Sequence, residues 1–429
     1  MRGRIADGNP FELDRTDAKH HDCSRRLQKM ERPHGIRILT INSGSSSLKM
    51  ALFAMGDRET LVFGVEVDRI GESASQFRVT DGRGHQSADL QPRISNQQEA
   101  FDAAFTVLQR QAHGERVDAI SHRIVHGGPR YLEPQLLSPQ LIAELRALVP
   151  IDPDHLPQAI RDVENANRKY PNVPQIGCFD TAFHRAMPRI AQLCPLSAQY
   201  FDKGILRYGF HGLSYEYVLS ELRILDGELA NGRVVAAHLG NGASMAAIRG
   251  GRSLDASMGF TPTSGLLMGT RSGDIDPGVI LYLLAQEKRT AENINTVINK
   301  QAGLLGVSGI SGDMQELLAQ EDSNSNAADA VALFCYRAKK YLAAYAAVLG
   351  GLDIIVFTAG IGEHAPIIRE RICSGLGFLG VKIDPARNRR NAPVISSDDS
   401  RVKVRVVKTN ENLMLARHAA RLLDKIKRE

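Results

Sequence analysis

Short apolar runs recur along the chain, and three of them end in turns rich in glycine or serine. Residues 36–42 (IRILTIN) and 234–239 (VVAAHL) are β-rich runs that each lead through a polar turn into a second strand. Residues 354–364 (IIVFTAGIGEH) begin as a buried type of strand and run into a third glycine turn. Because the first two units are alike and lie about 200 residues apart, the pattern predicts two related domains that face a shared cleft.

Helical patterns lie between these strand units. Residues 97–112 carry apolar positions at helical spacing, and residues 327–349 form a long helical pattern that stops at Gly350 and Gly351. Strands that alternate with helices predict the α/β class. A chain of 429 residues is also long enough to favour two domains over one core.

The first 34 residues stand apart, because they are polar and show no sustained period of 2 or 3.6. They also lack the apolar segment of a signal peptide. We therefore expect residues 1–35 to form a disordered or weakly ordered extension before the first domain.

Composition narrows the class of protein. Apolar content of 43%, charged content of 24% and a net charge of +5 are ordinary for a globular chain, and no basic run supports nucleic-acid binding. No apolar run approaches the ~18 residues that a membrane span needs. The five cysteines are odd in number and lack CxxC spacing, which favours reduced thiols in the cytoplasm over a zinc site or disulfides.

Glycine is dense in residues 238–278, which hold nine of the chain's 38 glycines. This density suits backbone that turns with positive φ or approaches a ligand closely. A phosphate-handling segment and an irregular structural loop both fit the pattern at this point.

Polar clusters lie at the ends of other apolar runs. HRIVHGG at 122–128 predicts a strand and a Gly-Gly turn that expose Arg123 and His126. FDTAFH places Asp180 after an apolar run, and YGFHGLS places His211 in a turn where Ser214 caps the following helix. Each alone reads equally well as a cap or a satisfied polar group. Together they stand where open α/β sheets assemble their sites.

These residue types suit phosphoryl transfer. Arginine binds planar carboxylates and phosphates through two parallel hydrogen bonds, and the reaction mainly requires positioning and neutralisation of charge. A hydroxyl acceptor needs a base, whereas a carboxylate acceptor is already ionised and needs cations. Arg123 and Arg271 together with a histidine favour the carboxylate.

Seven motifs in order resemble the acetate kinase family, within the acetate and sugar kinase/Hsp70/actin superfamily. They are INSGSSSLK, HRIVHGG, FDTAFH, YGFHGLS, HLGNGAS with GTRSGDIDPG, FTAGIGE and NENLMLA, from about residue 36 to the C-terminus. The resemblance implies reversible transfer from ATP to acetate, which gives ADP and acetyl phosphate. It also implies Mg²⁺, with Mn²⁺ as an alternative, and a homodimer whose subunits each have two RNase H-like (actin-like ATPase) domains.

The resemblance assigns roles motif by motif. It implies catalytic roles for Asp180, His211 and Arg271, and metal binding by Asn42 and Glu411. For Asp180, the orientation of an arginine or of a Mg²⁺-bound water is our hypothesis. The substrate carboxylate site would comprise Arg123, Val125, His155, Phe210 and Pro262. The nucleotide site would comprise Ser45, Ser47, Lys49, His238, Leu239, Gly240, Asn241, Gly242, Asp313, Met314, Gln315, Gly360, Ile361, Gly362, Glu363 and His364.

The chain departs from the family pattern at three places. PDHLP at 153–157 keeps His155 but has Asp154 where a leucine helps to form the pocket for the methyl group of acetate. Met314 and Gln315 replace the usual Phe-Arg, and His364 replaces an asparagine. The first departure concerns which acyl group is accepted, and the others concern nucleotide preference.

Other functions remain open from the sequence. A propionate or other short-chain carboxylate kinase is the alternative in the same family. A sugar kinase would use Asp180 as a base, and an actin- or Hsp70-like ATPase would leave HRIVHGG without a role. We expect residues 36–182 with 411–429 to form the first domain and residues 183–410 to form the second.

Overall fold

The computed structural model describes residues 35–44, 46–71, 75–89, 93–111 and 115–429. The extension predicted for residues 1–35 therefore lies outside the described residues, except for Gly35. Ser45, which we expected at the nucleotide site, also lies outside them.

Eight strands form the first sheet, in the order β5-β4-β3-β2-β1-β6-β8-β7. Their bounds are Ile36–Ser43 (β1), Ser47–Met55 (β2), Thr60–Asp68 (β3), Gln76–Asp81 (β4), Gln86–Asp89 (β5), Ala119–Ile124 (β6), Gln135–Leu136 (β7) and Gln175–Phe179 (β8). Strands β1 to β5 pair antiparallel, whereas β6 runs parallel to both β1 and β8.

The second sheet repeats the central part of the first. Its order is β11-β10-β9-β12-β13, with bounds Arg233–Leu239 (β9), Ala243–Arg249 (β10), Arg252–Ala256 (β11), Ile354–Thr358 (β12) and Lys403–Val406 (β13). Three antiparallel strands, β11-β10-β9, are followed by two strands parallel to β9, as in β3-β2-β1-β6-β8. The α/β class and the pair of related units that the sequence predicts are confirmed.

Helices cover both faces of each sheet. Their bounds are Gln97–Gln111 (α2), Pro139–Ala147 (α3), Leu156–Lys169 (α4), Arg189–Gln192 (α5), Ala198–Asp202 (α6), Gly212–Asp226 (α7), Pro277–Ala285 (α8), Ala291–Lys300 (α9), Gly303–Ser308 (α10), Met314–Gln320 (α11), Ser325–Leu349 (α12), Ala359–His364 (α13), Pro366–Cys373 (α14), Pro385–Arg389 (α15) and Glu411–Arg428 (α16). The helices predicted at 97–112 and 327–349 are confirmed as α2 and α12, and Gly350 ends α12 with a φ of 71°. Among the helices of the described ranges, none is both long and apolar enough to cross a bilayer.

The period-2 alternation of β1 explains how its sheet is buried. Leu39 and Ile41 pack with α2 on one face, and Ile36 and Ile38 pack with α16 on the other. The C-terminal helix α16 therefore belongs to the first sheet, although it follows the whole second sheet in the chain.

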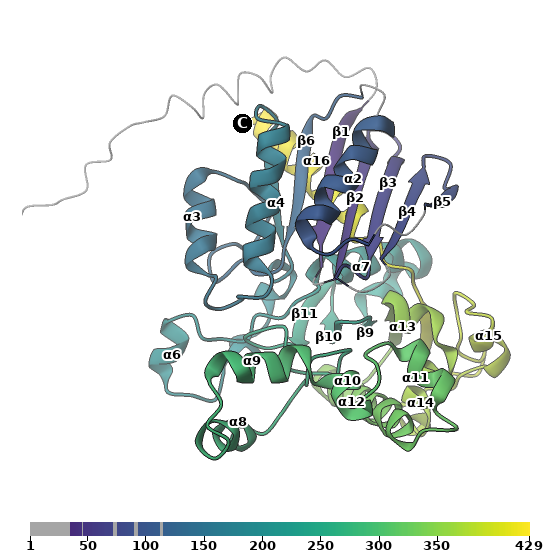
Figure 1. The fold of residues 1–429 in the computed structure, drawn as a ribbon. Coiled ribbons are helices and arrows are strands. Elements are labelled where there is room, and N and C mark those ends of the chain that lie inside the picture. The colour runs from purple at the N-terminus through teal and green to yellow at the C-terminus, as the bar shows by residue number, and fades with distance from the viewer. Residues whose placement is uncertain (1–34, 45, 72–74, 90–92, 112–114) are drawn as a thin grey trace, which may run out of the picture.

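Two helices join the halves of the molecule. Figure 1 shows the first sheet in the upper half, the second sheet below it and α7 between them. Helix α7 contacts α16 as well as β9, and Val218 and Leu222 pack on Val234 and Ala236 of the second sheet. The division at residues 182/183 and 410/411 stays a prediction.

The N-terminal cap predicted for α7 is wrong. The helix begins at Gly212 directly after His211, so Ser214 lies inside its first turn. The Ser214 hydroxyl instead contacts Nδ1 of His238 at 2.8 Å and the hydroxyl of Thr409 at 2.9 Å. The hydroxyl of Ser214 thus binds partners that are distant in sequence, and a local capping pattern does not reveal such partners.

Candidate active site

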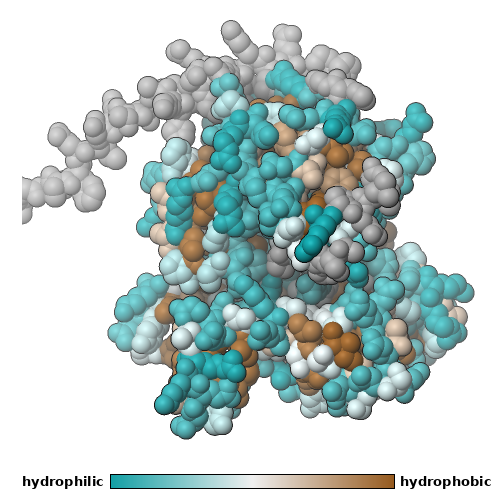
Figure 2. Space-filling model, viewed as in Figure 1, coloured by the Kyte–Doolittle hydropathy of each residue, from teal (hydrophilic) through white to brown (hydrophobic). Residues whose placement is uncertain are grey.

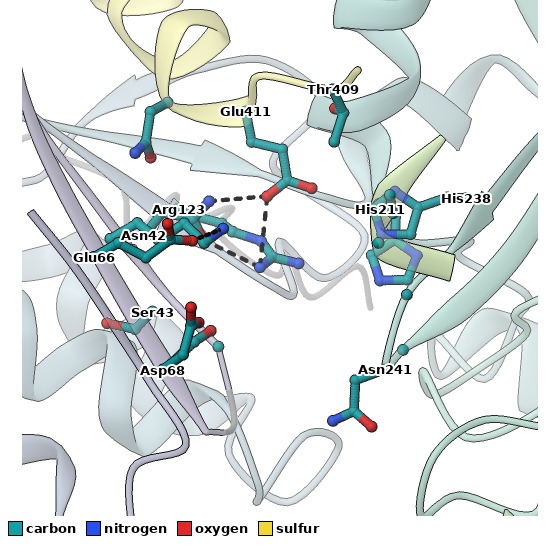
Figure 3. Close-up of a pocket in the computed structure, with 18 of the residues that line it drawn as sticks. Asn42, Ser43, Glu66, Asp68, Arg123, His211, His238, Asn241, Thr409 and Glu411 are labelled. Carbon is teal, nitrogen blue, oxygen red and sulfur yellow. Dashed lines mark hydrogen bonds and ion pairs between the residues drawn. The ribbon is translucent and has the colours of Figure 1, made fainter. Parts of the chain in front are cut away.

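A cleft of about 740 Å³ lies where the ends of strands from both sheets converge. Figure 3 shows Asn42, Arg123 and Glu411 on one side of it and His211, His238 and Asn241 on the other. The first group comes from β1, β6 and the start of α16, and the second comes from the residue before α7, from β9 and from the β9–β10 turn. Polar strand ends from two sheets therefore line one cavity.

Three glycine turns border this cleft. Gly44 lies between β1 and β2, Gly240 and Gly242 lie between β9 and β10, and Gly360 is the second residue of α13, which follows β12. Strands β1 and β9 hold equivalent places in their sheets, so the fold repeats one hairpin turn on each side of the cavity. Exposed backbone N–H groups in such turns suit phosphate oxygens.

Arg123 is the centre of a charged network at the base of the cleft. Its Nη2 and Nε donate to Asp180 Oδ2 at 2.6 and 3.0 Å, and its Nη1 donates to Asn42 Oδ1 at 3.1 Å. Asn42 Nδ2 in turn donates to Glu411 Oε2 at 2.8 Å. The Asp180 side chain is 1% exposed and that of Arg123 13%. The network joins the residues expected at the acceptor site to those expected at the metal site.

Burial and opposite charge compete within this network. Burial acts to lower the pKa of Arg123, but the carboxylates of Asp180 and Glu411 outweigh it and raise that pKa. Burial likewise acts to raise the pKa of Glu411, but Arg123 and His238 hold it below its ordinary value. Burial raises the pKa of Asp180, against the opposing effect of Arg123. The guanidinium therefore stays charged inside the protein.

Two histidines stack at the opposite wall. The rings of His211 and His238 lie 4.1 Å apart and are inclined by 18°. Burial lowers the pKa of His238 to about 4, and burial, with further cationic neighbours, lowers that of His211 well below its ordinary value. Both rings are therefore neutral at pH 7, and neither Nδ1 faces the cleft freely, because Ser244 and Ser214 hold them at 2.8 Å.

The backbone at His211 is strained in a way that places its ring in the cleft. Its φ is 60°, a left-handed conformation that is uncommon for a residue with a side chain. Gly212 permits the next step, because its N–H donates to the Asp180 carbonyl at 3.0 Å, and a Cβ there would approach that oxygen to 2.3 Å. The YGFHG motif thus fixes the start of α7 against Asp180, whose catalytic role stays a prediction.

Arg271 reaches the cleft from the long loop after β11. Its Nη1 donates to the Pro262 carbonyl at 3.1 Å, and its Nη2 donates to His155 Nε2 at 3.1 Å. His155 comes from the segment before α4 in the first half of the chain. A second arginine therefore lies in the cavity and is held from both halves.

The expected exposure of His126 is wrong. The residue is fully buried, with its ring against Tyr208 at 4.4 Å and Phe210 at 5.5 Å between centroids. Burial lowers its pKa to about 4, and its Nδ1 accepts from the N–H of Gly128 at 2.9 Å. The Gly-Gly turn directs this side chain into the core, behind the apolar wall that includes Phe210.

Lys49 lines the cleft from β2 and forms an ion pair with Glu66 of β3. Burial acts to lower the pKa of Lys49, but Glu66 outweighs it and raises that pKa. Glu66 and Asp68 also pair with Arg78 of β4. A nucleotide phosphate that binds Lys49 would therefore compete with the Glu66 carboxylate.

A buried arginine holds the third turn. Arg369 is fully buried and donates to the carbonyls of Gly362 and Glu363 at 2.8 and 3.0 Å. The Glu363 carboxylate accepts from the N–H groups of Ala359 and Thr409 at 2.8 and 3.1 Å. Glu363 thus ties α13 to the segment before α16, and only part of its surface faces the cleft.

Most of the residues that the sequence singles out line this one cleft. They are Asn42, Ser47, Lys49, Arg123, Val125, His155, Asp180, Phe210, His211, His238, Gly240, Asn241, Gly242, Pro262, Arg271, Gly360, Glu363, His364 and Glu411. Six others lie outside its lining, namely Leu239, Asp313, Met314, Gln315, Ile361 and Gly362. Leu239 and Met314 are buried, and Asp313 caps α11 and pairs with Arg69 at 3.4 Å. The functional roles of all these residues stay predictions.

Sequence reasoning missed part of the lining. The additional residues are Ser43, Gly44, Ser46, Glu66, Asp68, Arg78, Gln86, Ala359, Lys408, Thr409, Asn410 and Asn412. The residues of the first turn and of the segment before α16 lie next to motifs named in the sequence analysis. Their position in the sequence could therefore have identified them. Glu66, Asp68 and Arg78 alternate along β3 and β4 and read as the solvated face of a sheet.

Asp154 does not line the cleft. Its Oδ1 pairs with Nζ of Lys300, at the end of α9, at a distance of 3.2 Å. The aspartate that stands at the family's leucine position therefore directs its charge toward the second half of the chain. Val125, Phe210 and Pro262, which we expected at the substrate site, do line the cleft.

The oxygen donors at Asn42 and Glu411 suit Mg²⁺. Within the described ranges, no group of three or more His, Cys, Asp or Glu side chains is placed to hold a metal ion. Mg²⁺ commonly binds through one or two carboxylates together with water and nucleotide phosphates. One carboxylate and one amide beside two phosphate-type turns fit that kind of site better than a closed protein cage.

Comparisons with family models, with curated relatives and with solved structures all indicate the same family. The model of the Acetokinase family matches residues 37–417. An acetate kinase of Halothermothrix orenii is 43% identical over 399 residues, which cover 91% of this chain and 100% of that protein. The chain is thus similar to this relative along nearly its whole length.

Solved structures agree. An acetate kinase of Porphyromonas gingivalis is 37% identical, with a TM-score of 0.78 and coverage of 91% of this chain and 100% of that one. A propionate kinase of Francisella tularensis is 34% identical, with a TM-score of 0.80 and coverage of 89% and 98%. The fold of this chain is thus similar to both over about nine-tenths of its length.

Proposed function

The chain belongs to the acetokinase family, and we propose on that premise that it transfers a phosphoryl group reversibly between ATP and acetate. The products in the forward direction are ADP and acetyl phosphate. The acceptor is a carboxyl group, as in the acetate kinases to which the chain is similar.

The observation that carries this proposal is the pairing of Asp180 with Arg123. A hydroxyl acceptor would need a free base, but the Asp180 carboxylate is held by three hydrogen bonds from the guanidinium. A carboxylate acceptor is already ionised and needs a cation to hold it near an anionic nucleotide. Arg123 supplies that cation, and Asp180 keeps it in one orientation.

Arg271 and His211 are suited to stabilise the moving phosphoryl group. Such a group carries negative charge on its equatorial oxygens, and preorganised donors that face it lower the barrier. Arg271 offers a guanidinium whose Nη1 and Nη2 are both held by hydrogen bonds. A neutral His211 whose Nδ1 accepts from Ser244 would offer its Nε2–H as a further donor.

The acyl group would lie against Val125, Phe210 and Pro262, which are the apolar members of the lining near Arg123. A short alkyl chain fits apolar contacts of this kind. Propionate is the second candidate substrate, because the similar structure from Francisella tularensis is a propionate kinase.

ATP and ADP are the co-substrates implied by the family, together with a divalent metal. We infer that the metal is Mg²⁺, which Asn42 and Glu411 would hold with nucleotide phosphates. A bound Mg²⁺ neutralises phosphate charge during the transfer. The turns at 44–47 and 240–242 would bind the phosphates.

A homodimer is supported by helix α8. None of its residues is buried in the single chain, and Leu281 and Tyr282 are 64% and 58% exposed. Figure 2 shows apolar surface near α8 and α9 at the lower edge of the molecule. A second copy of the chain would cover this helix, and sedimentation of the wild-type chain against Leu281→Lys tests it. We expect a dimer that the substitution dissociates, and a monomeric wild-type chain would contradict this.

We place the enzyme in the cytoplasm. The four described cysteines, Cys178, Cys194, Cys335 and Cys373, are unpaired, and three of them are buried. Unpaired thiols suit a reducing compartment. Cell fractionation with an antibody to the chain tests this placement.

The direct test of function is ADP formation with Mg²⁺–ATP, with hydroxylamine present to trap an acyl phosphate as its hydroxamate. We expect ADP and hydroxamate in equal amounts with acetate, and neither with glucose or glycerol. ADP formation that is independent of acetate would favour an ATPase, and phosphorylation of a polyol would favour a sugar kinase.

A further inference from the structure

A buried carboxylate that the sequence did not single out touches the cleft through His155. Asp152 is 3% exposed and lies three residues before His155. Its Oδ1 is 2.7 Å from His155 Nδ1, and His155 Nε2 is 3.1 Å from Nη2 of Arg271. Asp152, His155 and Arg271 therefore form one chain of contacts that reaches from the first half of the sequence into the second.

The proton positions in this chain follow from donor chemistry. A guanidinium has only donors, so His155 Nε2 must accept from Arg271 and must carry no proton. Nδ1 then carries the proton and donates it to Asp152. The contacts require a neutral His155 in its Nδ1–H form, with an oxygen of Asp152 as the acceptor.

The Asp152 side chain has no structural task that would explain its burial. Among the residues that the structure describes, His155 is the only hydrogen-bond partner of its carboxylate, and the buried Oδ2 has none. It does not cap α4, which has no side-chain cap. Burying a carboxylate with a single partner costs free energy unless positive charge lies near. Such charge is present, because the Asp152 carboxylate acts to raise the pKa of both Arg271 and Arg123.

We propose that Asp152 is a positioning residue for phosphoryl transfer, which fixes the tautomer of His155 so that His155 holds the Arg271 guanidinium across the cleft. This proposal rests on the proposed function, because it assigns Arg271 to the transferring phosphoryl group. Without the carboxylate, His155 can move its proton to Nε2, where two donors would then face each other. Arg271 would keep its charge but lose its orientation.

Steady-state kinetics of three variants test the role. We expect Asp152→Ala to lower kcat by about 10- to 100-fold, as the loss of an orienting partner commonly does, with the KM for ATP and for acetate within about threefold. Asp152→Asn keeps an oxygen that can accept from Nδ1–H, so we expect it to recover most of kcat. Among the described residues, Glu164 of α4 pairs with the exposed Arg146 alone, so Glu164→Gln should leave kcat unchanged.

A double-mutant cycle separates positioning from general stability. If Asp152 acts through His155, Asp152→Ala should have no further effect on kcat in the His155→Ala background. Full additivity of the two losses would overturn the proposal. So would an Asp152→Ala enzyme with wild-type kcat, or one whose loss lies wholly in KM.

The tautomer itself gives a readout independent of activity. ¹⁵N NMR of histidine-labelled protein, assigned with His155→Gln, should show the Nδ1–H form of His155 in the wild-type chain and the Nε2–H form in Asp152→Ala. An unchanged tautomer would overturn the proposal. A wild-type chain without acetate-dependent turnover would instead refute the proposed function, while this spectrum would still report on Asp152. Should Asp152→Ala fail to fold, Asp152→Asn is used, and a wild-type tautomer and kcat are expected.

Discussion

Arg123 and Asp180 show how one residue pair decides the kind of acceptor. The bidentate contact is made of charge-assisted hydrogen bonds inside the protein, where each is strong and costly to break. The pair holds the cation where an ionised acceptor needs it. It also takes away the free base that a hydroxyl acceptor would require.

Asp180→Asn should therefore lower kcat strongly. An amide can accept from Arg123 through one oxygen only and carries no charge, so the guanidinium loses its orientation. We expect a loss of about 100-fold, which corresponds to roughly 3 kcal/mol in the barrier. The measurement is kcat with saturating acetate and Mg²⁺–ATP. Asp202→Asn, on an exposed position of α6, is the matched control, and a near-normal kcat in Asp180→Asn would refute an essential role.

A second prediction about a single residue concerns Asp154. Because its carboxylate pairs with Lys300 and lies outside the cleft, its replacement should not reshape the acyl site. We expect Asp154→Leu to change the ratio of kcat/KM for acetate over propionate by less than about threefold, below the effect of one methylene on binding. A shift of tenfold or more would place Asp154 at the acyl group.

Single residues also show which parts of the site could be predicted from the sequence and which could not. Arg123, Asp180 and His211 lie in motifs whose spacing singles them out, and all three line the cleft. Asp152 precedes a proline in a turn and resembles many surface aspartates. Its partner His155 is local, but the contact that links the pair to the cleft joins His155 to Arg271, 116 positions later, and no local pattern contains it.

Among the elements, the start of helix α7 depends on one glycine. Gly212 brings its first turn against the Asp180 carbonyl, and the strained His211 precedes it. The strain persists because packing on both sides determines this conformation.

Gly212→Ala should therefore damage both stability and catalysis. The new Cβ would lie 2.3 Å from the Asp180 carbonyl oxygen, so α7 must shift, and His211 must shift with it. We expect a loss of about 1–3 kcal/mol in the free energy of unfolding and at least a tenfold loss in kcat. Urea unfolding and initial rates measure the two. Gly377→Ala, where a Cβ meets nothing within 4 Å, should change neither, and an intact Gly212→Ala enzyme would contradict this view of the motif.

Elements were predictable to different degrees. The hairpins at β1–β2 and β9–β10 were predictable because period-2 burial and turn residues are local signals. The cap at Ser214 was predicted wrongly because its hydroxyl partners, His238 and Thr409, come from other elements. The polar faces of β3 and β4 could not be assigned to the cleft, because a polar alternation is the same whether it faces water or a binding site.

For the whole molecule, buried neutral histidines set the response to acid. Burial lowers the pKa of four of them to about 4, namely His122, His126, His184 and His238. The pKa in the unfolded chain is about 6.5. The stability that they contribute is complete above about pH 6.5 and is lost as the pH falls toward 4, because the unfolded chain binds the additional protons.

The free energy of unfolding should thus fall between pH 7 and pH 5. Each histidine contributes up to about 1.4 kcal/mol per pH unit in this window. Burial raises the pKa of Asp162 to about 6, which works in the opposite direction and offsets about one histidine. Urea midpoints at pH 7, 6 and 5 measure the net effect. Exposed His85→Gln should show the same slope as the wild-type chain, and a flat profile would contradict the assignment of neutral buried rings.

At this scale the repeated sheet order brings two equivalent hairpin turns to one cavity, and α16 returns the end of the chain to the first half. The two related units were predictable from their similar turns. The contacts between them, such as Arg271 with His155, depend on how the units pack and were not.

The most direct measurement is kcat/KM of the wild-type chain with Mg²⁺–ATP for formate, acetate, propionate and butyrate. An arginine-held carboxylate beside a small apolar wall predicts acyl phosphate formation with an optimum at acetate, a lower value for propionate and a steep fall for butyrate. An optimum at another acid would keep the mechanism but change the substrate. ADP release that none of the four acids stimulates would contradict the assignment of a carboxylate acceptor.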